Sequence, residues 1–321
     1  MTELTTNMSV KLNTGYQMPI VGLGTWQSKP GEVATAVEAA LKNGYRHIDC
    51  AWAYGNQKEI GDVFTRLFSG EIKREDVFIT SKIWNTYHSY EEAKKNINMI
   101  LSELQLSYID LLLIHWPMGY KEGGEPFPKD SEGKKMLYSD VDYLDTWKAL
   151  EEAQKEGKVR SIGISNFNHK QISRLLEKGH VKPAVLQIEI HPYLQQKKLR
   201  WFCKEKGITV VAYSSLGNPG SAMFRQEGDP NILEEKLVKE IAQKHGKTTA
   251  QVALRWAVQN GILVIPKSTK EERIRQNADL FNFELSQEEM SQIESLDRNW
   301  RIVDLTASSG DHPHFPFAEE Y

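Results

Sequence analysis

Apolar runs along this chain end in polar residues at a regular spacing. Three of these runs carry a polar residue near their carboxyl ends: Asp49 in residues 45–50, Lys82 in 77–83 and His115 in 109–116. The three polar residues are 33 positions apart each time, which is about the length of one strand–helix repeat. If the runs are neighbouring parallel strands, all three side chains emerge at one rim of one sheet. A carboxylate, an amine and an imidazole gathered at one rim are typical of a catalytic site.

Short β-type runs alternate with amphipathic helical stretches along almost the whole chain. The β-type runs predict eight strands, at residues 20–24, 45–50, 77–83, 109–116, 160–167, 184–190, 208–213 and 262–266. Apolar residues at helical spacing predict helices at 31–43, 57–68, 89–106, 140–156, 170–178 and 195–206. Eight β/α units that close on themselves form a (β/α)8 (TIM) barrel, an α/β fold. No internal boundary is visible, so residues 1–321 are predicted to form a single barrel domain.

A doubly wound open sheet is the alternative architecture for such an alternating pattern. Dinucleotide-binding proteins of that fold usually carry the motif G-x-G-x-x-G after their first strand. Here Gly22 and Gly24 match the first two positions, but Gln27 stands where the third glycine should be. No other segment fits better, and the barrel is therefore preferred.

Three segments exceed what a minimal barrel needs. Residues 10–12 and 18–20, joined by the turn 13–15, predict an N-terminal hairpin that could plug the bottom of the barrel. Residues 119–139 read as a long irregular loop, and the aromatic-rich tail 299–321 shows no helical period. Long loops in compact domains tend to be lids or binding loops. Loop and tail are expected to cover the rim that carries Lys82 and His115.

The overall composition excludes several classes of protein. Forty basic and 43 acidic residues leave a net charge of −3, without a basic run that would indicate nucleic acid. The first ten residues lack the pattern of a signal peptide, and the most apolar segment is too short to span a bilayer. Two cysteines support neither a disulfide framework nor a cysteine metal cluster, so no metal site is predicted. A soluble protein in the reducing cytoplasm is expected.

A tyrosine joins the three polar residues at the predicted rim. Tyr54 follows Asp49 by five residues, on the loop above the strand end. A free tyrosine is a poor proton donor at neutral pH because its pKa lies near about 10. A neighbouring ammonium favours the phenolate, so Lys82, itself paired with Asp49, is expected to lower this pKa. With His115 hydrogen-bonded to a substrate carbonyl, the group could protonate an oxygen that gains negative charge.

At this point the chain resembles the aldo-keto reductase superfamily, and within it the aldose and aldehyde reductases. The matching segments are residues 22–26 (GLGTW), 49–56 (DCAWAYGN), 81–82 (SK), 114–117 (IHWP), 163–167 (GISNF), 187–189 (QIE), 213–214 (YS) and 265–268 (IPKS). They extend over nearly the whole chain in this order, which makes chance agreement negligible. The resemblance implies reduction of aldehydes and ketones to alcohols with NADPH. In the reaction that the resemblance implies, the nicotinamide donates hydride, Tyr54 donates the proton and His115 orients the carbonyl.

The resemblance also implies a cofactor site and a substrate site. The residues implied to bind the cofactor are Thr25, Trp26, Ser165, Asn166, Gln187, Tyr213, Ser214, Leu216, Lys267, Ser268, Thr269, Arg273 and Asn277. Among these, Tyr213 would stack on the nicotinamide, and Lys267 and Arg273 would bind the 2′-phosphate. Independently, the end of the last strand is where barrels commonly bind phosphate, and two cations favour NADP over NAD. An aromatic cup for lipophilic carbonyl compounds would comprise Trp26, Trp84, His115, Trp116, Phe127 and Trp300.

The chain departs from the family pattern at three positions. Gln27 and Gly220 are uncharged where aldose reductases have a lysine and an acidic residue that clamp a loop over the pyrophosphate. A weaker ionic latch and faster cofactor release are therefore expected. Val303 replaces a reactive cysteine of the tail, which leaves the substrate range open. His115 argues against relatives that reduce carbon–carbon double bonds, because these carry glutamate at that position.

Two functions of other classes remain open at this stage. Lys82 could form a Schiff base in an aldolase-like enzyme, but that function leaves Tyr213, Lys267 and Arg273 without a role. The chain could also be a non-catalytic, cofactor-sensing or structural protein on the reductase fold. The four intact polar residues at the rim argue against it. Small carbonyl compounds are the expected partners, without nucleic acid or membrane, and a monomer is expected from the resemblance.

Overall fold

The strands form one closed parallel barrel. The computed structural model describes residues 8–70 and 72–318 of the chain. Eight parallel strands lie in the spatial order β10-β9-β8-β7-β6-β5-β4-β3. Their bounds are β3 Leu23–Gly24, β4 His47–Asp49, β5 Phe78–Ile83, β6 Ile109–Ile114, β7 Val159–Ser165, β8 Val185–Glu189, β9 Thr209–Tyr213 and β10 Leu263–Val264. The backbone N–H of Gly22 donates to the Val264 carbonyl at 2.8 Å, which joins the two outermost strands. The predicted (β/α)8 fold is confirmed.

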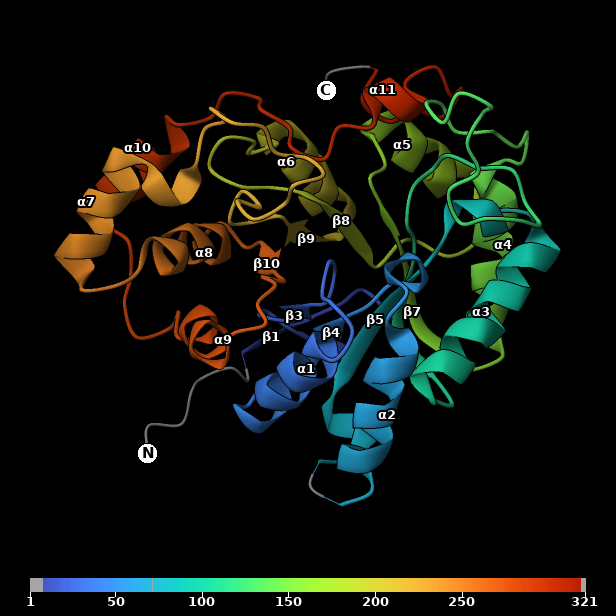
Figure 1. Ribbon diagram of the computed structural model, residues 1–321, viewed down its shortest axis with the longest axis horizontal. Helices are drawn as coiled ribbons and strands as arrows, with labels where there is room; N and C mark the ends of the chain where they lie inside the picture. Colours follow the sequence, from blue (N-terminus) through green and yellow to red (C-terminus); the bar gives the residue numbers. More distant parts are fainter. Residues whose placement is uncertain (1–7, 71, 319–321) are drawn as a thin grey trace.

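The helices surround these strands (Figure 1). Their bounds are α1 Glu32–Lys42, α2 Gln57–Phe68, α3 Tyr90–Leu104, α4 Tyr143–Lys155, α5 His169–Lys178, α6 Lys197–Lys206, α7 Lys236–His245, α8 Thr249–Gln259, α9 Glu271–Ala278, α10 Gln287–Glu294 and α11 Thr306–Ser309. Short 3-10 helices are η1 Trp52–Tyr54, η2 Arg74–Asp76, η3 Asn85–Tyr87 and η4 Ile232–Glu234. The six predicted helices are all present within about three residues of their predicted ends, whereas α7, α8 and α10 were not predicted.

A hairpin closes the lower end of the barrel, as predicted. Strands β1 (Ser9–Lys11) and β2 (Gln17–Pro19) are antiparallel. Leu12 and Met18 are buried in one apolar cluster with strand residues such as Phe78 at the lower end of the barrel interior. The hydroxyls of Thr14 and Ser161 also lie 2.7 Å apart, which ties the turn to β7. The apolar side of the hairpin therefore removes the barrel interior from water at this end.

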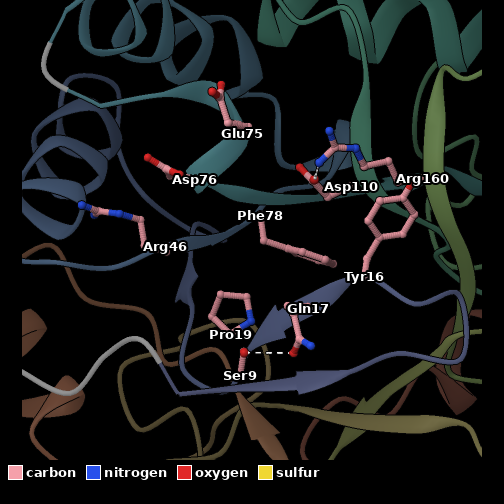
Figure 2. Close-up of a pocket in the computed structure, with 10 residues that line it drawn as sticks. All are labelled: Ser9, Tyr16, Gln17, Pro19, Arg46, Glu75, Asp76, Phe78, Asp110 and Arg160. Atoms are coloured by element: carbon pink, nitrogen blue, oxygen red, sulfur yellow. Dashed lines mark hydrogen bonds and ion pairs between the residues drawn. The ribbon is translucent and has the colours of Figure 1, made fainter.

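A hollow of about 310 Å³ lies beside the hairpin at this lower end (Figure 2). Phe78, Asp110 and Arg160, which line it, stand at the amino ends of their strands. The Asp110 carboxylate pairs with Arg160 at 3.1 Å and with Arg74 at 2.7 Å. These ion pairs join the amino end of β6 to that of β7 and to the 3-10 helix before β5, so we interpret the hollow as structural. It lies at the end opposite to the predicted site, since Asp49, Lys82 and His115 follow the carboxyl ends.

The loop 119–139 and the tail meet above the carboxyl ends of the strands. The Tyr120 hydroxyl lies 2.9 Å from the Ser309 hydroxyl, and His312 donates from Nε2 to the Gly119 carbonyl at 3.1 Å. The tail contains one helical turn, α11, where no helical period was predicted. Residues 319–321 of the predicted tail lie outside the described residues. No helix within the described ranges is long and apolar enough to cross a membrane.

Candidate active site

A buried ion pair stands at the carboxyl ends of β4 and β5. The Lys82 ammonium lies 2.7 Å from Asp49 Oδ2, and their side chains are 0% and 2% exposed. Gln187 on β8 donates from Nε2 to the other carboxylate oxygen of Asp49 at 2.9 Å. A buried charge is tolerated only when it is paired and hydrogen-bonded, and both conditions hold here. The parallel register therefore brings together the Asp49 carboxylate and the Lys82 amine, as their spacing in the sequence predicted.

Tyr54 is the third member of this chain of polar groups. It ends η1, directly after β4, and its hydroxyl accepts a hydrogen bond from the Lys82 ammonium at 3.2 Å. The third hydrogen bond of Lys82 goes to the Cys50 carbonyl at 2.9 Å. Burial raises the pKa of Tyr54 well above its usual value, and the Asp49 carboxylate raises it further. The prediction that the pKa of Tyr54 is lowered is wrong, because burial and the Asp49 carboxylate both raise it.

A raised pKa keeps the Tyr54 phenol protonated at neutral pH, so it holds the proton that a donor needs. The hydrogen bond from the Lys82 ammonium favours the phenolate at the moment when the proton leaves. Lys82 is therefore placed to stabilise the charge that Tyr54 gains during proton transfer, even though it does not ionise the resting phenol.

His115 faces Tyr54 from the end of β6. The two rings are inclined at 76°, with centroids 5.8 Å apart, and the Trp84 ring also contacts the imidazole, with a centroid distance of 5.2 Å. Burial lowers the pKa of His115 well below its usual value, and the Lys82 charge adds to this effect. The imidazole is therefore neutral at neutral pH, and one ring N–H can donate to an uncharged acceptor such as a carbonyl.

Aromatic and apolar side chains form a cup around Tyr54 and His115. Its buried members are Trp84, Trp116, Met118, Tyr120, Val303 and Phe315. Phe127 contacts Trp84 at 5.1 Å, and Trp26 contacts Phe224 at 5.8 Å. Phe224 was not predicted, since it lies in an irregular loop without periodicity. We call the six buried side chains together with Trp26, Phe127 and Phe224 the aromatic cup.

Trp300 lies apart from the rest of the predicted aromatic cup. Its ring contacts Tyr193 at 6.2 Å, and the Arg225 guanidinium lies 5.0 Å from its centroid. It belongs to a separate apolar cluster with Tyr193, Ile232 and Ala253. The structure therefore does not bring Trp300 against Trp84 or Trp116, and its predicted contact with substrate stays a prediction.

The residues predicted to bind nicotinamide lie next to the polar groups of the site. The Tyr213 hydroxyl donates to Asn166 Oδ1 at 2.7 Å, and Asn166 Nδ2 donates to the His115 carbonyl at 3.0 Å. Asn166 has a φ of 62°, a conformation that asparagine adopts more readily than most residues. Ser165 adjoins it at the end of β7, and the Thr25 hydroxyl donates to the Asp49 carbonyl at 2.8 Å.

The residues predicted to bind the cofactor phosphates lie along the loops after β9 and β10. Ser214 and Leu216 are half-buried, and Ser214 opens the loop with a φ of 50°. After β10, Lys267 is exposed and donates to the Gln27 carbonyl at 2.9 Å. Ser268 and Thr269 follow it, and the buried Asn277 and the exposed Arg273 lie on α9.

Two observations show that this region fits a polar ligand. Asn218 Nδ2 and Ser221 Oγ are buried but have no hydrogen-bond partner among the described residues. Arg273 makes no ion pair within the described ranges, so its guanidinium is available to an anion. Gly220 is exposed with open space around it, and the weaker ionic latch expected from the sequence stays a prediction. No group of three or more metal-ligating side chains occurs in the described part of the chain.

The fold is a (β/α)8 barrel, and the candidate active site stands at the carboxyl ends of its strands, where barrel enzymes carry their catalytic residues. The family model for the aldo/keto reductase family matches residues 20–298. The chain therefore belongs to the aldo/keto reductase family and is an oxidoreductase, as the resemblance implied.

The relatives of this chain are similar to it over almost their whole lengths. Aldo-keto reductase family 1 member A1 of Gallus gallus is 46% identical, over 97% of this chain and 98% of the relative. The protein of the same name from Homo sapiens is 45% identical over the same shares. The solved structure of the aldose reductase from Schistosoma japonicum is similar to this chain with a TM-score of 0.91. The two sequences are 45% identical, and the match covers 98% of this chain and 100% of the aldose reductase chain.

Proposed function

We propose that this chain reduces aldehydes and ketones to alcohols with NADPH. The observation that carries the proposal is the chain of hydrogen bonds from the buried Asp49 and Lys82 to the half-buried Tyr54, whose phenol faces a neutral His115. The names of its relatives, aldo-keto reductase and aldose reductase, agree with carbonyl reduction. The apolar surface of the aromatic cup favours aromatic or lipophilic substrates.

The polar residues divide the work on the carbonyl oxygen among them. When bound, the nicotinamide supplies a hydride to the carbonyl carbon. The His115 N–H would hold the oxygen by a hydrogen bond, and the Tyr54 hydroxyl would give it a proton. Lys82 would stabilise the resulting phenolate, and Asp49 would hold Lys82 in place. Trp84 and Trp116 would exclude water from this step.

Residues around the barrel rim would hold the cofactor. Tyr213 would lie against the nicotinamide ring, and Ser165, Asn166 and Gln187 would bind its carboxamide. Ser214 and Leu216 would lie by the pyrophosphate, with Thr25 and Trp26 on the opposite side of the site. Lys267, Ser268, Thr269 and Arg273 would bind the 2′-phosphate, and Asn277 would lie near the adenine. Members of this family generally use a nicotinamide cofactor, and the two cations favour the phosphorylated form.

The direct test is the loss of NADPH absorbance at 340 nm with benzaldehyde as substrate, repeated with NADH. Oxidation that needs the aldehyde and prefers NADPH would support the proposal. Tight NADPH binding without turnover would instead favour a cofactor-sensing protein. Absence of binding would contradict both functions.

Arg273→Ala is expected to weaken NADPH binding about tenfold to a hundredfold and to leave NADH binding unchanged. A hydrogen bond to a charged group contributes about 1.5–3 kcal/mol, and only NADPH carries the phosphate that Arg273 would bind. Quenching of protein fluorescence by each cofactor would give the two dissociation constants. Arg275→Ala is the matched control, since Arg275 is also exposed on α9. Equal losses for NADPH and NADH would contradict the assignment of Arg273.

The kcat for aldehyde reduction is expected to show no ionisation of His115 between pH 6 and pH 8. The pKa of His115 lies well below its usual value, so the imidazole is already neutral in this pH range and becomes charged only at more acid pH. An exposed histidine would instead titrate near about 6.5. Single-turnover rates measured across this range would check the point. A break in the rate near pH 6.5 that disappears in His115→Gln would contradict a neutral His115.

The environment of Lys82 argues against a Schiff-base aldolase. Its ammonium donates to Asp49, Cys50 and Tyr54, which uses all three of its N–H groups, and its side chain is fully buried. A nucleophilic lysine must instead present a neutral amine to its substrate. Borohydride trapping of a carbonyl compound on Lys82 would support the aldolase.

We also propose that residues 1–321 form one domain, that the protein is a cytoplasmic monomer, and that its partners are small carbonyl compounds. The family model covers most of the chain without interruption, which supports the single domain. Size-exclusion chromatography with light scattering would test the monomer.

A further inference from the structure

Glu189 is a buried carboxylate that the proposed reaction does not use. It ends β8, next to Tyr213 in the register of β8 with β9, and its side chain is fully buried. No lysine or arginine in the described part of the chain forms an ion pair with it. Leaving a carboxylate unpaired in the interior is costly, so its hydrogen bonds must compensate.

Those hydrogen bonds come chiefly from the backbone of the tail. Glu189 Oε1 accepts from the Ile302 N–H at 2.7 Å, and Oε2 accepts from the Val303 N–H at 2.8 Å. His191 donates its Nε2 proton to Oε1 at 2.8 Å, since a carboxylate only accepts. One side chain on the barrel rim thus binds two consecutive amides that lie more than a hundred residues further along the chain.

The tail is held elsewhere by other contacts, so this one acts locally. Before it, the Trp300 N–H donates to the Tyr193 carbonyl at 3.0 Å. After it, Ser309 and His312 bind the loop 119–139. Among the described residues, the two bonds to Glu189 are the only hydrogen bonds that tie residues 301–305 to the barrel.

The segment that Glu189 holds is part of the wall of the aromatic cup. Val303 is buried in the same cluster as Trp84 and Trp116. We propose that Glu189 is a positioning residue that fixes Val303 against the aromatic cup and thereby sets the preference for carbonyl substrates with a large apolar group. This inference rests on the proposed function. A small aldehyde reacts at Tyr54 and His115 without reaching this wall, whereas a bulky ring gains from burial against it.

Glu189→Gln tests the contact with little change in shape. The amide keeps one acceptor oxygen but turns its NH2 group toward a backbone N–H, so at least one tail bond is lost. We expect trypsin to cleave after Arg301 about tenfold faster, because this site adjoins the released Ile302 amide. We also expect kcat/KM for 2-naphthaldehyde to fall about tenfold through KM, while kcat/KM for propanal changes less than about twofold.

Glu235→Gln is the matched control. Glu235 accepts from the Tyr193 hydroxyl at 2.6 Å and from Arg298 at 3.2 Å, so it holds the base of the tail but not the cup wall. Its ratio of naphthaldehyde to propanal kcat/KM should equal that of the wild type. If the ratio of the Glu235→Gln variant fell as far as that of the Glu189→Gln variant, a specific role of Glu189 would be overturned.

Cleavage after Arg301 is a readout that does not depend on activity, so the inference can fail separately from the proposed function. Unchanged cleavage in Glu189→Gln would overturn the inference whatever the enzyme does. Equal losses for both aldehydes would also overturn it, since they would place the effect on the cofactor or the chemical step. If Glu189→Gln does not fold, Glu189→Asp keeps the charge but shortens the side chain by one methylene. Cleavage of that variant must then accelerate, and an unchanged rate would overturn the inference.

Discussion

Tyr54→Phe is expected to lower kcat for aldehyde reduction by about 10³-fold and to leave the dissociation constant of NADPH within about twofold. The change removes one hydroxyl and keeps the ring that packs against His115. Proton donation by a positioned group contributes about 10²–10⁴-fold to a rate, and no other described hydroxyl accepts a hydrogen bond from the Lys82 ammonium. Single-turnover oxidation of NADPH with benzaldehyde measures the effect without interference from product release.

Tyr108→Phe is the matched control for this experiment. Tyr108 precedes the amino end of β6, at the end of the barrel opposite to the candidate site, and its hydroxyl has no hydrogen-bond partner among the described residues. We expect its kcat to equal that of the wild type. If Tyr54→Phe kept more than about a tenth of the wild-type rate, another group would have to supply the proton, and the proposed mechanism would be wrong.

The spacing of polar residues predicts the location of the site because parallel strands repeat at nearly constant length. Asp49 and Lys82 lie on neighbouring strands, and the register of β4 with β5 brings their side chains into contact. The N-terminal hairpin is predictable for a similar reason, since a turn between two short β-type runs is a local signal. Both features depend on residues close together in the sequence or on a regular repeat.

The environment of Tyr54 could not be predicted from the sequence. The sequence shows that an ammonium follows in a neighbouring strand, but it does not show how much water the folded rim excludes. Desolvation by burial is the largest cause of the pKa shift, and it depends on how side chains from distant segments such as Trp26 and His115 pack around Tyr54. The contact of Glu189 with the tail is equally inaccessible, because its partners are 113 and 114 residues away.

Irregular segments account for the remaining differences. Residues 214–231 contain no periodic pattern, so the position of Phe224 could not be predicted. The helices α7 and α8 that follow do carry local signals that were overlooked, namely apolar residues at helical spacing in α7 and a capping box formed by Thr248 and Gln251 at the start of α8. The resemblance assigns Trp300 to the cup, and its contact with substrate stays a prediction. Its surroundings could not be predicted, because its backbone N–H donates to the Tyr193 carbonyl and Arg225 lies against its ring. In such segments the conformation is set by distant partners and not by local propensity.

Lys82→Met is expected to lower the free energy of unfolding by about 3–5 kcal/mol and to abolish measurable reduction. Methionine fills a similar volume, so packing changes little, but the Asp49 carboxylate remains buried without a cation. The same change removes the hydrogen bond that stabilises the Tyr54 phenolate. Urea-induced unfolding followed by tryptophan fluorescence would give the loss of stability, and the NADPH assay the loss of activity.

The double variant Lys82→Met with Asp49→Asn separates the two effects. Because asparagine carries no charge, we expect it to recover most of the lost stability without restoring activity, since Tyr54 still lacks its ammonium. Lys134→Met is the control, because its ion pair with Glu132 is exposed and should contribute less than about 1 kcal/mol. If Lys82→Met were as stable as this control, the Asp49 carboxylate would not depend on Lys82. If the double variant regained activity, Lys82 would have no part in proton transfer.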